Sequence, residues 1–239
     1  MTQRRSIEAP RSAAAQNPLA EARAAFARRA WADAFDAHCL ADSRAPLLVE
    51  DLEHYAWSAA MLGRDAEFLQ ILERLYHAHV GAARACQAAR AAFWIGLRAS
   101  AMGQRARASG WLGRAQDLVR AFGEDCAECG YLRIPNAYEC LVKGDLAAAE
   151  IAASEAVSIG RRFEDPNLLA IAQTVHGRTL IYQGRVEAGL ALLDQAMLAV
   201  TSEDLVPPAV GVVYCSMIAT CHRVFALERA QEWTAALSN

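Results

Sequence analysis

The chain has 239 residues, 54% of them hydrophobic, and its 24 basic and 27 acidic residues leave a formal net charge of −3. This balance offers no positive surface for nucleic acid or for an anionic membrane. No stretch approaches the roughly 20 apolar residues that cross a bilayer, and the first 18 residues lack the apolar core of a secretion signal. We therefore expect a cytoplasmic protein that contacts no membrane.

Residues 1–18 are polar and alanine-rich and contain two prolines, a composition that predicts a disordered tail. From residue 19 onward helix-forming residues dominate, and runs of alternating β-branched residues are missing. Even the string Val-Gly-Val-Val-Tyr at 210–214 stands at the head of a helical pattern. We expect residues 19–239 to form one all-α repeat domain.

Four glycines recur at nearly equal steps: Gly63, Gly103, Gly144 and Gly184 are 40, 41 and 40 residues apart. Because an apolar helical stretch precedes and follows each of them, each glycine is predicted to form the tight turn inside a helical hairpin. A repeat of roughly 20–50 residues is typical of an α-solenoid. The expected fold is a right-handed superhelix of about six hairpins with a period near 40 residues.

The repeat extends beyond the four glycines in both directions. Val224 lies 40 residues after Gly184, where a hairpin is predicted without its glycine, and an earlier, shorter hairpin turns around Ala30. Prolines fall between the hairpins, where helices are expected to stop: Pro46, Pro166 and Pro207-Pro208. The predicted hairpins cover residues 19–42, 50–79, 84–121, 131–160, 167–200 and 209–238.

A small residue follows most of these glycines at a fixed distance. Ala115, Ala156 and Ala196 stand twelve residues after the last three glycines, a spacing similar to that of the tetratricopeptide repeat (TPR), whose minimal unit is about 34 residues. The longer steps resemble the helical repeats of LuxR-type (MalT-like) bacterial transcription regulators. The strings that carry this resemblance are GDLAAA at 144–149, GRRFEDP at 160–166, GRVEAGLALL at 184–193, VYCSMI at 213–218 and RAQEWT at 229–234.

This resemblance implies a non-catalytic sensor module that recognises an effector, either a small molecule or a protein. DNA would then be contacted only by a helix-turn-helix domain beyond Asn239, and the chain would be a fragment or a stand-alone relative. Lys143 is followed by Gly144-Asp145, so the phosphate-binding loop of such regulators is not matched here. The alternative function is a stand-alone TPR-type adaptor that binds a partner protein or forms a homodimer through its last hairpin.

The sequence offers no convergent set of titratable residues, so we expect no enzyme, cofactor or metal site. Cys126 and Cys129 form the one CxxC pair, within the predicted loop 123–130. Zinc would need two further ligands, and the acidic neighbours are expected to raise the thiol pKa rather than lower it. A structural role is favoured, while metal-binding and redox roles stay open.

Repeat geometry selects the candidate binding residues. In stacked hairpins of this kind the first helices line a concave groove, and the residues six and three before each glycine and one after it face that groove. The candidates for binding a ligand or partner are Trp57, Arg64, Ser100, Gln104, Tyr138, Leu141, Arg178, Ile181 and Arg185. Apolar walls with a few arginines suit a small organic acid or an amphipathic peptide. The alternative is that Trp57, Tyr138 and Leu141 pack between neighbouring repeats.

Overall fold

The computed structural model describes residues 17–202 and 204–237, and within these ranges the regular elements are all helices. The expected all-α fold class is therefore confirmed. The helices are α1 (Pro18–Ala27), α2 (Trp31–Arg44), α3 (Val49–Met61), α4 (Asp65–Gly81), α5 (Ala85–Ala101), α6 (Arg105–Phe122), α7 (Ala127–Tyr131), α8 (Arg133–Lys143), α9 (Leu146–Arg162), α10 (Pro166–Tyr182), α11 (Val186–Thr201), α12 (Pro207–Arg223) and α13 (Leu227–Ala236).

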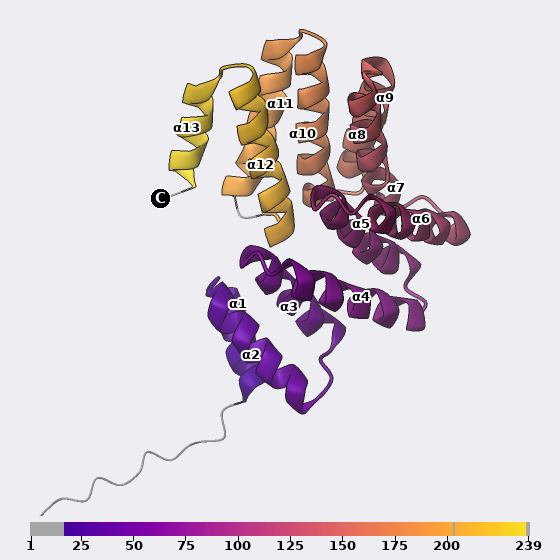
Figure 1. Cartoon of the computed structure of the whole chain (residues 1–239), viewed down its shortest axis with the longest axis vertical. Helices are drawn as coiled ribbons and strands as arrows, with labels where there is room; N and C mark the ends of the chain where they lie inside the picture. The colour runs from indigo at the N-terminus through magenta and orange to yellow at the C-terminus, as the bar shows by residue number, and fades with distance from the viewer. Residues whose placement is uncertain (1–16, 203, 238–239) are drawn as a thin grey trace, which may run out of the picture.

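Each helix packs against the next along the chain, with one change of partner in the middle. From α1 to α6 and again from α7 to α13, consecutive helices are in contact, whereas α7 packs on α5, α9 and α10. The described helices follow an arc that brings the start of α12 against α3 (Figure 1). None of them combines the length and the apolar character that crossing a bilayer demands.

The four recurring glycines are the left-handed residues of the predicted hairpin turns. Gly63, Gly103, Gly144 and Gly184 have φ of 68°, 74°, 79° and 84°. After each, the next backbone N–H reaches back to a carbonyl five residues earlier, as Arg64 does to Ala59 at 2.9 Å. This is the Schellman ending of a helix, which favours glycine because a side chain is strained at positive φ.

The same turn forms where the chain has no glycine. Arg29 and Phe225 both have φ of 58°, and the Ala226 N–H bonds to the Cys221 carbonyl at 2.9 Å. The repeat predicted this turn at Val224, whose φ is −107°, so the left-handed residue lies one position later than expected. Phe225 has no intrinsic preference for positive φ, so the packing of the two helices holds this turn closed.

The prolines and the short helix α7 correct three local expectations. Pro18, Pro166 and Pro207 begin α1, α10 and α12 rather than lying between helices, because the first helical position needs no backbone N–H donor. Residue 18 is therefore helical and not part of the predicted tail, and Asn17 caps α1. The rest of the predicted tail, residues 1–16, lies outside the described ranges. The predicted loop 123–130 contains the start of α7.

Candidate functional site

A central cavity of about 560 Å³ lies on the inner side of the arc. Its walls come from α3, α5, α8, α10 and α12, the first helices of five successive hairpins, and from the start of α4. The start of α12 lies next to α3 in Figure 1, so helices that are far apart in the sequence both contribute to its lining. Trp94, Leu97, Tyr138 and Val212 make its surface largely apolar. A cavity of this size suits a small organic ligand.

Three of the candidate groove residues meet in this cavity. Ser100, Tyr138 and Arg178 all line it, from α5, α8 and α10 respectively. They are 38 and 40 residues apart in the sequence, and the repeat geometry turns them to the same side. The choice of residues six and three before each turn glycine therefore identifies part of this lining from the sequence.

Three other candidates belong mainly to the packing between helices. Trp57 is 5% exposed and makes an edge contact with Trp94 at 6.1 Å between ring centroids. Ile181 is 6% exposed, and Leu141 is half-buried against the same core. Trp57 and Leu141 thus pack between helices, which is the alternative to a binding role. Tyr138 both touches the core and lines the cavity.

The remaining candidates, Arg64, Gln104 and Arg185, are exposed residues at the starts of second helices, outside the central cavity lining. Arg64 pairs with Glu67 at 2.8 Å and lies over the Phe35 ring at 4.1 Å. These three side chains belong to the outer rim of the hairpin turns.

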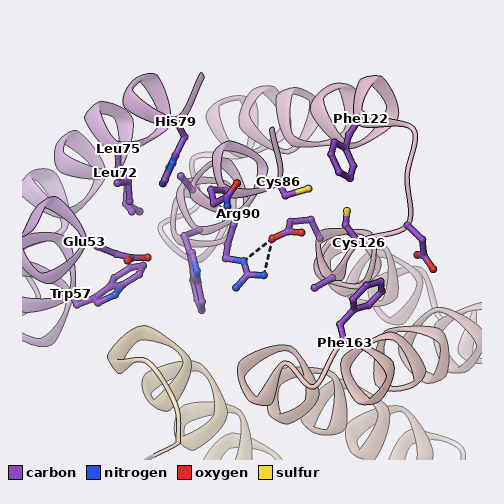
Figure 2. A pocket seen from close by; sticks show the side chains of 16 residues that line it. Glu53, Trp57, Leu72, Leu75, His79, Cys86, Arg90, Phe122, Cys126 and Phe163 are labelled. Atoms are coloured by element: carbon purple, nitrogen blue, oxygen red, sulfur yellow. Dashed lines mark hydrogen bonds and ion pairs between the residues drawn. The ribbon is translucent and has the colours of Figure 1, made fainter. Parts of the chain in front are cut away.

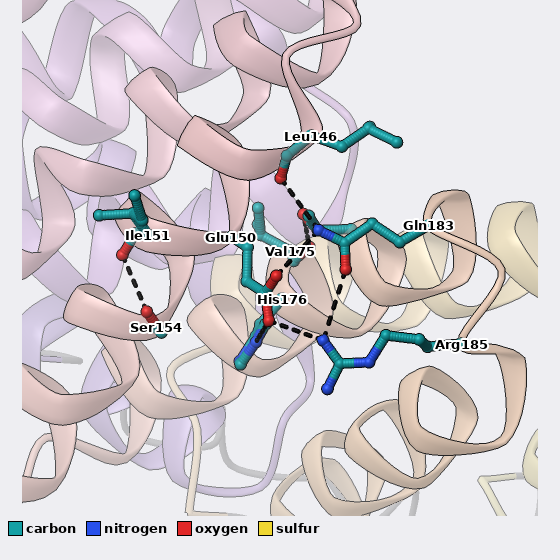
Figure 3. Close-up of polar contacts among 9 residues, drawn as sticks. Leu146, Glu150, Ile151, Ser154, Val175, His176, Gln183 and Arg185 are labelled. Carbon is teal, nitrogen blue, oxygen red and sulfur yellow. Dashed lines mark hydrogen bonds and ion pairs between the residues drawn. The ribbon is translucent and has the colours of Figure 1, made fainter.

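Arg185 takes part in a polar cluster that ties two hairpins together (Figure 3). Its guanidinium donates to Glu150 at 2.8 Å, and the Gln183 amide donates to the other oxygen of the same carboxylate at 2.9 Å. Gln183 also bonds to the Leu146 carbonyl at 3.2 Å. The Gln183 hydrogen bond, followed by that of Arg185, lowers the pKa of Glu150. This cluster therefore joins α9 to the α10–α11 turn and is a packing contact.

Two arginines line the central cavity, and only one of them is paired with a carboxylate of the described residues. Arg98 is neutralised by Asp65 through two hydrogen bonds of 2.7 Å. Arg178 is half-buried, and its Nε donates to the Tyr182 hydroxyl at 3.2 Å, but no carboxylate of the described residues pairs with it. Arg223 donates to the same hydroxyl, and it too has no carboxylate partner in the described ranges. The cavity therefore carries an unneutralised guanidinium beside apolar walls.

Sequence reasoning missed the α12 side of the cavity. Pro207, Gly211, Val212 and Ser216 all line it, and none of them is six or three residues before Val224 or one after it. The missing information is the curvature of the arc, which brings the start of α12 against α3.

A second cavity, the side cavity, has a volume of about 450 Å³ and lies beside α5 and α7 (Figure 2). Cys86 and Cys126 lie in its wall, and Cys129 is 3.8 Å from Cys126 between sulfur atoms. Burial raises the pKa of Cys126 to about 12; a hydrogen bond with the Cys129 backbone opposes the rise, and the Cys129 and Cys86 thiols add to it. The pKa of Cys126 is thus raised, as expected, but by burial and the neighbouring cysteines and not by the acidic residues of the loop. A protonated thiol is a poor nucleophile.

No family model matches the chain, and no curated protein matches it. The similarity to LuxR-type regulators therefore rests on the sequence strings alone.

Proposed function

We propose that the chain is a non-catalytic binding module whose central cavity takes a small organic anion with an apolar body. The observation that supports this most directly is Arg178, a half-buried guanidinium in the wall of an apolar cavity without a carboxylate partner in the described chain. Arginine binds carboxylates through two parallel hydrogen bonds, and the Tyr138 ring offers a flat apolar surface beside it.

The wider proposal follows the sequence resemblance. In it the hairpins form a right-handed superhelix of six TPR-like units, and the module serves a LuxR-type transcription regulator as its effector sensor. A ligand that contacts α5, α10 and α12 at once would favour one curvature of the arc, since it binds only where those helices are correctly spaced. That change of curvature would be the signal passed to a DNA-binding domain.

The experiment is a thermal-shift screen of the full chain against aromatic and aliphatic carboxylates, each paired with its uncharged amide. A ligand that binds the folded state raises the melting temperature by mass action. We expect carboxylates to raise it and the matching amides to have little effect. Replacing Arg178 by glutamine should weaken carboxylate binding at least tenfold, because a charge-assisted hydrogen bond contributes about 1.5–3 kcal/mol.

Arg105→Gln provides the matched control, because Arg105 is an exposed arginine of α6 that does not line the cavity. It should leave ligand binding unchanged. Equal responses to carboxylates and amides, or equal losses in the two variants, would contradict the proposal.

A protein-binding function is the second candidate, and one observation favours it. Leu198 of α11 is 59% exposed and Phe225 of the α12–α13 turn is 88% exposed, and both line the same surface hollow. Large apolar side chains exposed together are typical of protein interfaces. If this face joins two copies of the chain, light scattering should detect a dimer, and Leu198→Glu should convert it to a monomer. Val142→Glu is the control, because Val142 is equally apolar, 88% exposed and located on α8. A monomer at all concentrations would exclude dimerisation.

A further inference from the structure

The fold brings a third cysteine to the CxxC pair. Cys86 lies in the first turn of α5, Cys126 immediately precedes α7, and Cys129 lies within it. A sulfur of Cys86, a sulfur of Cys126 and a carboxylate oxygen of Glu128 all lie within 4.8 Å of one another. Forty residues separate Cys86 from Cys126, so no spacing rule of the sequence links them.

The distances fit a tetrahedral thiolate site. Zinc binds thiolate sulfur at about 2.3 Å, and two ligands of a tetrahedron at that distance are about 3.8 Å apart. The Cys126 and Cys129 sulfurs are 3.8 Å apart. Cys86, Cys126 and Glu128 already lie within 4.8 Å of one another, whereas Cys129 is close to Cys126 but outside that group. A turn of the Cys129 side chain toward the other three would complete the four donor atoms that structural zinc sites use.

The carboxylate is held in position by other side chains, as metal ligands usually are. Glu128 is 5% exposed and accepts hydrogen bonds from Arg90, at 2.9 Å from Nε and 2.7 Å from Nη2 (Figure 2). Arg90 also pairs with Asp165 at 3.1 Å, and Asp165 accepts the Tyr131 hydroxyl at 3.0 Å. Glu128 can therefore approach an ion only in a narrow range of positions.

Charge and access also favour this cluster over a second group of possible metal ligands among the described residues. Three thiolates and Glu128 carry four negative charges, and a dication with Arg90 supplies three positive charges, so the ion offsets most of the negative charge that the deprotonated ligands bring together. By contrast, His38, His54 and Asp51 offer a single negative charge, which Arg23 already neutralises at 2.7 and 2.8 Å. Cys86 and Cys126 also lie in the wall of the side cavity, which gives an ion a path to the site.

We propose that Cys86, Cys126, Cys129 and Glu128 bind one zinc ion or a similar thiophilic dication. The ion would link α5 to α7, at the point where the helix packing changes partner. Binding would displace the thiol protons and join the first part of the arc to the second. The central-cavity proposal does not depend on this site, because none of the four ligands lines that cavity.

The test uses the full chain, fully reduced and freed of metal with a chelator, and titrates it with Co²⁺ as a coloured substitute for zinc. We expect near-ultraviolet absorption from thiolate-to-cobalt charge transfer and the visible bands of tetrahedral cobalt. Both should saturate at one ion per chain and disappear when Zn²⁺ is added. A reduced chain that shows no charge-transfer absorption would overturn the proposal.

Cys86→Ser distinguishes the proposed site from metal binding by Cys126 and Cys129 alone. It should weaken binding at least tenfold and reduce the charge-transfer absorption by about a third, as expected for three thiolates becoming two. Cys215→Ser, at an exposed cysteine of α12, should leave both unchanged. Binding that survives intact in Cys86→Ser would overturn the proposal.

Alkylation of the unmodified protein gives a second measurement if Cys86→Ser does not fold. Zn²⁺ should slow the alkylation of Cys86, Cys126 and Cys129, with mass spectrometry as the readout, and should leave the exposed Cys39 and Cys215 reacting at their original rate. If Zn²⁺ leaves the alkylation rate of each of these five cysteines unchanged, the proposal is wrong.

Discussion

Phe225 shows how a single residue carries strain that the fold imposes. Its φ is 58°, a conformation that costs a residue with a side chain of the order of 1 kcal/mol, and its ring is 88% exposed, so little packing offsets the cost. The equivalent residue is a glycine in four of the other hairpin turns, Gly184 for example, whereas the first turn has Arg29 with the same φ of 58°. The strain at Phe225 is therefore local and can be removed by substitution.

Replacing Phe225 by glycine should raise the free energy of unfolding by about 0.5–1 kcal/mol, because glycine adopts positive φ without strain. Urea denaturation followed by circular dichroism measures the change. The matched control is Val224→Gly, one residue earlier, where φ is −107° and glycine should destabilise the chain. If both variants change stability in the same direction, the assignment of the turn to Phe225 is wrong.

His38 is a fully buried histidine whose environment favours the neutral imidazole. Its Nδ1 lies 2.8 Å from the Ala34 carbonyl, and its Nε2 has no hydrogen-bond partner among the described residues. Burial is the main cause that lowers its pKa, and His54 and Arg23 act in the same direction, while the hydrogen bond with the Ala34 carbonyl and the charge of Asp51 oppose them. The folded state therefore binds a proton at His38 less readily than the unfolded chain does.

This difference predicts acid destabilisation that begins near the ordinary histidine pKa of about 6.5. As the pH falls below that value the unfolded state takes up the proton first, so the unfolding free energy falls by up to about 1.4 kcal/mol per pH unit for one such group. Denaturation at pH 7.5 and 5.5 measures the loss. It should be smaller in His38→Gln, whereas His222→Gln, at an exposed histidine, should keep the original loss. An unchanged loss in His38→Gln would contradict the argument.

At the scale of helices, small residues that the repeat search did not select allow the two helices of a hairpin to approach closely. A Cβ on Gly189 would lie 2.4 Å from the Gly177 carbonyl oxygen, and a Cβ on Gly177 would lie 2.6 Å from that of Gly189. Gly177 precedes the turn glycine by seven residues and Gly189 follows it by five. The matching pair around Gly103 is Gly96 and Ala108, also buried. A pattern search at these two offsets would have located the helix crossings.

Gly189→Ala should destabilise the chain by about 1–3 kcal/mol, because the new methyl group meets a backbone oxygen that cannot move without shifting α10. Thermal denaturation should show a lower melting temperature. Gly110→Ala, within α6 and open on its Cβ side, should instead stabilise by about 0.5–1 kcal/mol through helix propensity. A Gly189→Ala protein at least as stable as the unmodified chain would refute the close crossing.

At the scale of the whole molecule, the proposed binding site depends on the curvature of the arc. The contact between α12 and α3 encloses a cavity to which five hairpins contribute. Ser100, Tyr138 and Arg178 could be selected from the sequence because each occupies a repeat position on a first helix. Gly211 and Val212 could not, because their approach to α3 is the sum of many small rotations between successive helices.

Gly211→Leu tests whether the central cavity is the binding site. A Cβ at this position meets no atom within 4 Å, so the larger side chain can enter the cavity without disturbing the core. We expect the folded chain to keep or slightly raise its melting temperature and to lose the shift that carboxylates produce. Gly110→Leu, far from the cavity lining, should keep the shift. A normal response in Gly211→Leu would place binding elsewhere.

The sequence by itself determined the helical fold class and the positions of four hairpin turns, because helix propensity and left-handed glycines act over a few neighbouring residues. It also located the arginine and tyrosine of the inner face through the repeat period. Only the tertiary structure brought Cys86 to the CxxC pair, set α12 against α3 and left Arg178 without a carboxylate partner among the described residues. Those relations join residues that are tens of positions or more apart, and their geometry comes from helix packing accumulated over the chain.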